Sequence, residues 1–138
     1  AELETVEQVM SLYRDDSQLC RLNRERIVTR PHPYLVEVLT AAAATSQLSD
    51  GAFDVTVQPL WDLFASAKKE GRLPTNEEIA ETRQAVDWRS VVARCDSIEL
   101  KEPVRSVTLN GIAQGFAADR VVKALREHGI QHALINAG

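Results

Sequence analysis

The sequence predicts an α+β fold in a single domain, with a helix-rich front part packed on a mostly antiparallel sheet. Three observations lead there. Apolar residues spaced three and four apart dominate the first two-thirds of the chain, as in amphipathic helices. Residues 98–109 instead alternate β-branched and polar side chains, as in paired strands. The length of 138 residues, 44% of them hydrophobic, suffices for one core.

Composition excludes several classes of function. The chain carries 16 basic and 20 acidic residues, a net charge of -4, which offers no electrostatic footprint for nucleic acid. No apolar run reaches the length of a membrane span. The charged fraction of 26% is that of an ordinary folded protein, so disorder is not indicated either.

Two helices are expected before residue 29. The first runs to about Asp15, on the spacing of Leu3, Val6, Val9, Met10 and Tyr13. Asp15 to Ser17 then supplies a stop and a new N-cap, and a short second helix follows through Leu19 and Leu22. The two prolines in 29–33 predict a loop, because proline is excluded from helix interiors.

Three further helices are expected in the middle of the chain. Residues 34–47, rich in Leu, Val and Ala, predict a buried helix that ends at Ser49 to Gly51. Residues 52–57 predict only a turn or a short extended piece. A helix over 60–69 follows, closed by Gly71. Thr75 and Glu78 form a capping box in front of the next helix.

Strands are expected near the end of the chain. Residues 98–100 and 104–109 predict an antiparallel pair joined by a turn at 101–103. A helix is expected over 113–128, stopped by Gly129, and a strand over 133–135. Because the chain stops just after that strand begins, we expect 1–138 to be a single but incomplete domain.

Three clusters of residues could carry chemistry, and each also has a structural interpretation. Ser11 to Asn23 gathers small polar groups at a helix–loop junction, where N-capping would explain them. Ser49 to Asp54 could hold an aromatic ligand against Phe53, or simply terminate a helix. Thr108 to Gly115 leads from a strand into a helix start that could bind an anion, or its glycines could serve helix packing.

Cysteine, histidine and tryptophan add no site of their own. Cys20 and Cys95 form no metal-binding pattern and are expected to be buried free thiols, with a disulfide left open. The three histidines do not cluster at ligand spacing. Trp61 and Trp88 are expected in the core or at its border.

In this order and at these separations, the three clusters resemble the ApbE family of flavin transferases. The matching blocks are S-L-Y-R-D-D-S-Q-L-C-R-L-N at 11–23, G-A-F-D-V-T-V-Q-P-L at 51–60 and I-A-Q-G-F-A-A-D-R at 112–120. A strand ending N-A-G at 136–138 matches a fourth block. The resemblance implies that the chain is part of a larger ApbE-like, T-fold-like domain.

The resemblance also implies a flavin site and an activity. Tyr13 matches a position beside the flavin, Ala52, Phe53 and Asp54 match a flavin-contacting run, and Gly111 matches a Mg²⁺-ligating position. We expect the Asp54 carboxylate to orient the flavin, so that removing it leaves stability nearly unchanged. Such enzymes split FAD and move FMN onto a Thr or Ser hydroxyl of an acceptor protein, releasing AMP, with Mg²⁺ acting as a Lewis acid.

Two positions depart from the family pattern. Thr108 stands where the family has an acid, and Gln114 where it has a lysine. Both charges are lost together, which is electrostatically coherent because an unpaired buried charge would be costly. This form is similar to a subgroup associated with nitrous oxide reductase maturation. An alternative function is therefore an exported FAD-binding accessory protein without transferase activity.

The resemblance further implies a cellular location and binding partners. Family members act outside the bacterial cytoplasmic membrane, so a periplasmic location is expected, with membrane association through an N-terminal anchor that is absent from these residues. Further flavin contacts are expected before Ala1 and further Mg²⁺ ligands after Gly138. The partners implied are FAD and an acceptor protein that carries a Thr or Ser flavinylation motif.

Overall fold

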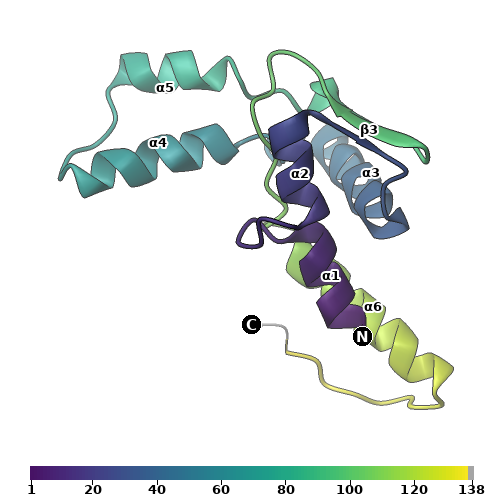
Figure 1. The fold of residues 1–138 in the computed structure, drawn as a ribbon. Helices are drawn as coiled ribbons and strands as arrows, with labels where there is room; N and C mark the ends of the chain where they lie inside the picture. The colour runs from purple at the N-terminus through teal and green to yellow at the C-terminus, as the bar shows by residue number, and fades with distance from the viewer. Residues whose placement is uncertain (137–138) are drawn as a thin grey trace.

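The computed structural model describes residues 1–136, and it forms a bent body with two projecting parts (Figure 1). Its helices are α1 (Glu2–Met10), α2 (Gln18–Glu25), α3 (Pro33–Leu48), α4 (Gln58–Lys69), α5 (Asn76–Arg83) and α6 (Ala113–Glu127), with a 3₁₀ turn, η1, at Trp88–Ser90. Its strands are β1 (Ile27–Thr29), β2 (Val91–Ala93) and β3 (Ser97–Leu100). The α+β class is confirmed, and no described helix is long and apolar enough to cross a bilayer.

One small sheet lies in the body, in the order β1-β3-β2, and both of its pairings are antiparallel. Val28 stands opposite Ile98, and both side chains are buried. The core beneath the sheet combines apolar faces of the first three helices with segment 104–109: Val9, Met10, Leu19, Leu22, Leu35, Val38, Leu39, Val104, Val107 and Leu109. Burial of these faces is what stabilises the body.

The predicted strand over 104–109 is wrong, although its burial is real. Val104, Val107 and Leu109 are buried, but β3 pairs with β1 and β2 instead. The backbone of 104–109 finds other partners. The Asn23 side chain donates to the Val107 carbonyl (2.9 Å) and accepts from its N–H (2.8 Å), as a neighbouring strand would.

Two other boundaries differ from expectation. α1 ends at Met10 rather than near Asp15, because Ser11 turns extended. Its carbonyl accepts the hydroxyl of buried Ser17, the N-cap of α2 (2.6 Å). The strand predicted over 133–135 is not formed in the described chain, and residues 137–138 of the N-A-G match lie outside the described residues.

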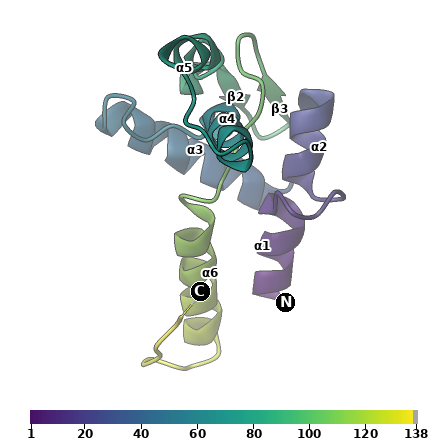
Figure 2. The same ribbon diagram turned by 90° about the vertical axis from the view of Figure 1, so that its left-hand side faces the viewer.

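Helices α4 and α5 form an arm that reaches away from the body, as two views show (Figures 1 and 2). They pack on each other, and α5 contains no buried residue. The expected capping box is present, with Thr75 and Glu78 exchanging hydrogen bonds. Arg72 adds a two-pronged ion pair to Glu78 (2.8 and 2.9 Å). The arm is thus held largely by its own polar contacts.

Helix α6 is the second projection and lies along α1. Arg120 ties it to α3, because its guanidinium pairs with Glu37 and stacks on the rings of Tyr34 (4.5 Å) and Phe116 (4.8 Å). The Tyr34 hydroxyl in turn donates to Glu2 (2.6 Å), and this hydrogen bond raises the pKa of Tyr34. These contacts fix the direction in which α6 leaves the loop at 108–112.

Candidate functional site

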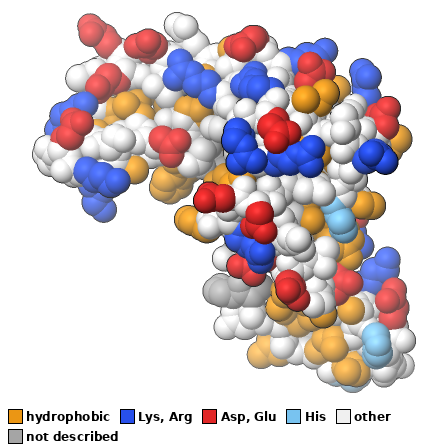
Figure 3. Space-filling view, viewed as in Figure 1, with side chains coloured by type: hydrophobic (Ala, Val, Ile, Leu, Met, Phe, Trp, Pro, Cys, Tyr) orange, Lys and Arg blue, Asp and Glu red, His pale blue; other side chains and the backbone are white. Residues whose placement is uncertain are grey.

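A cavity of about 610 Å³ lies where the arm joins the body. This is the inner corner of the bent molecule in the space-filling view (Figure 3). Its walls come from the α1–α2 loop, residues 52–58, the start of α4 and the loop before α6. The lining residues are Tyr13, Ala52, Phe53, Asp54, Val55, Val57, Gln58, Trp61, Thr108, Asn110 and Gly111. Its size is within the roughly 300–1,000 Å³ of small-molecule sites.

Six of the seven site residues expected from the sequence line this one cavity, and Gln114 does not. Gln114 is exposed in the first turn of α6, with no hydrogen bond from its side chain in the described chain. Thr108 is buried and accepts a hydrogen bond from the Asn110 N–H (3.3 Å). The structure therefore brings together three sequence clusters whose binding roles remain predictions.

The Asp54 carboxylate already has hydrogen-bond partners within the protein, which argues against the expectation that it is dispensable for stability. One oxygen accepts the N–H (2.8 Å) and hydroxyl (2.6 Å) of Thr56, and the other accepts the Trp88 N–H (3.2 Å). Thr56 is fully buried and accepts the N–H of Asp87 (2.8 Å). Asp54 thus joins the turn at 51–57 to η1.

The floor of the cavity is closely packed around Phe53. A Cβ added at Gly111 would lie 3.3 Å from the Phe53 ring, which is tighter than an ordinary contact. At the start of the same turn, Asp50 (φ 51°) and Gly51 (φ 80°) adopt the left-handed conformation, which bends the chain sharply out of α3. Glycine at 111 therefore lets the loop before α6 approach the aromatic ring.

Sequence reasoning missed the contribution of the arm. Val57, Gln58 and Trp61 line the cavity from the start of α4, whereas Trp61 was expected in the core or at its border. Trp61 is instead 68% exposed. A tryptophan one residue beyond the P-L pair of the second block was a usable signal, because large aromatic side chains at cavity mouths are common binding elements.

The described residues do not make a magnesium site by themselves. No cluster of three or more His, Cys, Asp or Glu exists within residues 1–136. Of the lining residues, Asp54 alone is a carboxylate, and its oxygens already accept three hydrogen bonds. Gly111 offers only backbone, and Mg²⁺ prefers an octahedron of oxygens. Lysine and arginine are likewise missing from the described lining.

The cysteines take no part in the cavity. Both are free, and Cys20 is half-buried with its thiol directed to the carbonyls of Ser11 and Leu12. Cys95 is exposed, which contradicts the expectation of a buried thiol.

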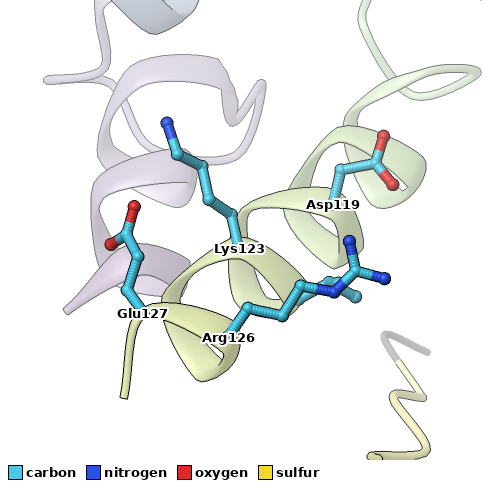
Figure 4. Close-up of a pocket in the computed structure, with 5 residues that line it drawn as sticks. Asp119, Lys123, Arg126 and Glu127 are labelled. Carbon is cyan, nitrogen blue, oxygen red and sulfur yellow. The ribbon is translucent and has the colours of Figure 1, made fainter. Parts of the chain in front are cut away.

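A second hollow, of about 510 Å³, follows one face of α6 and is lined by Asp119, Val122, Lys123, Arg126 and Glu127 (Figure 4). Acidic and basic side chains alternate there at helical spacing, as on an ordinary solvated helix face. The hollow contains none of the residues expected to bind a ligand. The cavity at the arm is therefore the better candidate.

Comparison with known proteins identifies the family of the chain. The model of the ApbE family matches residues 1–138. The FAD:protein FMN transferases of Vibrio cholerae and Haemophilus influenzae are each 32% identical to it, over 143 and 148 residues. These alignments cover 99% and 100% of this chain but 42% of each relative. The chain thus spans less than half the length of the curated relatives it matches.

Solved structures agree with the sequence comparison. The flavin transferase ApbE from Vibrio cholerae superposes with a TM-score of 0.83 at 29% identity, over 95% of this chain and 44% of that one. The apo form of the Pseudomonas stutzeri flavinyl transferase ApbE gives 0.81 at 28% identity, over 94% and 42%. With a family match along its whole length and the same fold, the chain belongs to the ApbE family.

Proposed function

We propose that the full-length protein transfers FMN from FAD to the hydroxyl of a threonine or serine in an acceptor protein and releases AMP. The observation that carries this proposal is the single cavity that unites Tyr13, the run 52–54 and the loop 108–111. These are the segments in which the chain resembles the flavin transferases. Relatives named FAD:protein FMN transferase support the same reaction.

The transfer is a displacement at one phosphorus of FAD. The acceptor hydroxyl oxygen forms a bond to the phosphorus of the FMN half. The bond from that phosphorus to the bridging oxygen breaks, the bridging oxygen leaves with AMP, and the hydroxyl proton is released. The contribution of the described residues is to bind and orient. Phe53 and Tyr13 offer ring surfaces, while Thr108, Asn110 and Gln58 offer neutral polar groups.

Magnesium dependence is part of the proposal on the strength of the resemblance alone. Of the expected ligands, the described residues include only Gly111, so the other ligands would have to come from elsewhere in the full-length protein. Chelation tests the dependence directly. Transfer by the full-length protein should stop with excess EDTA and resume when Mg²⁺ is restored, whereas activity unaffected by EDTA would remove the metal from the proposal.

The decisive experiment separates transferase from accessory protein. Full-length protein is incubated with FAD, Mg²⁺ and an acceptor domain that carries a threonine flavinylation motif, and the acceptor is analysed by mass spectrometry. The expected product is an acceptor heavier by one FMN less water, with AMP formed in equal amount. An acceptor whose motif threonine is replaced by valine is the control. FAD binding without any covalent flavin would favour the accessory protein, which the neutral Thr108 and Gln114 motivate.

A periplasmic location and a membrane anchor complete the proposal, again by resemblance. Cell fractionation of a producing bacterium tests it. The full-length protein should appear in the periplasmic or membrane fraction, and retention in the cytoplasm would contradict this part of the proposal.

A further inference from the structure

The packing of the described residues does not explain why a tryptophan occupies position 61. It lies on the first turns of α4, 68% exposed, and its ring stacks on no aromatic or cationic side chain in the described part of the chain. Its surface is shared between the candidate cavity and an adjoining apolar hollow of about 440 Å³, lined also by Val57, Leu60 and Phe64. Leaving so large an apolar ring in water is costly unless something covers it.

The cavity has aromatic side chains on three separate segments. Tyr13 comes from the α1–α2 loop and is 87% exposed, Phe53 lies in the floor against Gly111, and Trp61 comes from the arm. Polar lining is neutral apart from Asp54, whose oxygens are occupied. A cavity of this kind recognises its ligand mainly through flat ring surface rather than through charge.

We infer that Trp61 is a binding residue that stacks on one of the two planar ring systems of FAD, the flavin or the adenine. This inference rests on the proposed function and extends it, since it assigns to the arm a direct part in substrate recognition. The arm's other exposed aromatic, Phe64, lines the neighbouring hollow but not the cavity, so it should take no part. That difference makes Phe64 a matched control on the same helix.

The test compares Trp61→Ala, Trp61→Phe and Phe64→Ala in the full-length protein by titration with FAD, riboflavin and ADP. Trp61→Ala should weaken FAD binding about tenfold, Trp61→Phe should recover part of the loss, and Phe64→Ala should change it less than twofold. Because Trp61 is exposed, all three variants should keep the wild-type circular dichroism spectrum. A parallel loss for riboflavin assigns the contact to the flavin, and a parallel loss for ADP assigns it to the adenine.

Other outcomes overturn the inference in distinguishable ways. Equal FAD affinity for wild type and Trp61→Ala would refute the role of Trp61 and leave the proposed function intact. Equal losses of FAD affinity from Trp61→Ala and Phe64→Ala would refute direct stacking by Trp61, because Phe64 does not line the cavity. A wild-type protein that binds no FAD would refute the proposed function and this inference together.

Discussion

At the scale of single residues, Asp54 lines the candidate cavity and also holds the local structure together. Its carboxylate accepts three hydrogen bonds, two from Thr56 and one from the Trp88 N–H. Thr56 is fully buried, so its hydroxyl and N–H depend on that partner. Asp54 therefore positions the turn that carries Phe53, whatever contact it also makes with a ligand.

Replacing Asp54 with alanine should lower the free energy of unfolding by roughly 1–3 kcal/mol, because buried Thr56 would lose its acceptor. Urea denaturation of the full-length protein measures this. Asp62→Ala is the control, since that exposed carboxylate accepts one hydrogen bond from Gln58 within α4 (2.9 Å). Similar midpoints for the two variants would mean that the Asp54 contacts do not stabilise the fold.

Gly111 should tolerate no side chain without a cost to binding. The Cβ of Gly111→Ala would meet the Phe53 ring at 3.3 Å, so the ring must shift within the cavity. We expect FAD affinity to fall several-fold with little change in the melting temperature. Gly115→Ala, where no atom lies within 4 Å, should instead stabilise α6 by up to about 1 kcal/mol. Unchanged affinity in Gly111→Ala would show that the Phe53 ring is not part of the binding surface.

At the scale of elements, the sequence predicted what is decided locally. The periodicity of α3 and α6 and the Thr75–Glu78 capping box give each helix its own signal within one stretch of chain. Strands β1 and β2 were missed because each is three residues long, and their pairing with β3 is decided by distant residues. Segment 104–109 has the alternation of a strand, but the Asn23 side chain and the Val55 carbonyl take the place of strand neighbours.

The candidate site, like the fold, was predicted where the signal is local in sequence and missed where it depends on tertiary packing. Motif resemblance located most of the lining, because each motif is a contiguous run of residues. Gln58 lies within the second block and Trp61 directly follows it, but neither was assigned to the site, since the direction of the α4–α5 arm depends on packing at Pro59 and on the Asp54 network. Whether these two side chains reach the cavity is decided by tertiary packing and not by the local sequence.

The arm should weaken in acid through Glu78. A hydrogen bond from Arg72, and then one from the Thr75 N–H, lower the Glu78 pKa from 4.5 to about 2. Its contribution to stability is therefore complete above pH 4.5 and is lost as the pH falls towards 2. The protection factors of the α5 amides against hydrogen exchange should fall in the same interval, and Glu78→Gln should show lower protection already at pH 6. Glu77 makes no side-chain hydrogen bond within residues 1–136, so Glu77→Gln should resemble wild type. Equal protection in both variants would contradict the capping role of Glu78.

At the scale of the whole molecule, the chain covers 42% of the FAD:protein FMN transferase of Vibrio cholerae and 44% of the solved ApbE chain from the same organism. The cavity is open, and a groove between α1 and α6 has an apolar lining that includes Leu3, Val121, Ala124 and Leu125. Leu3 is 56% exposed. An exposed apolar lining of this kind is typical of a surface that packs against another protein surface.

Residues 1–138 produced alone should therefore bind FAD far more weakly than the full-length protein and should self-associate. Isothermal titration with FAD and millimolar Mg²⁺ measures the first, and light scattering after gel filtration the second. Leu3→Glu should reduce association without altering the cavity, which lies elsewhere. Micromolar binding by the isolated residues would show that the ligand needs nothing more than the described walls.

Two hydrogen bonds join the Asn23 side chain to the backbone of Val107, which lies 84 residues further along the chain. This separation bears on when the binding site forms during folding. Closing a loop of that length costs of order 4 kcal/mol of chain entropy before its contacts are gained. Thr108 directly follows Val107 and Gly111 lies three residues further on, so we expect this contact to help bring both towards Tyr13 and Phe53. Helices α1 to α3 can assemble earlier, from contacts nearer in sequence. We therefore expect the ligand cavity to form later in folding than the contacts among helices α1 to α3, so that ligand capture by a refolding molecule should report a late event.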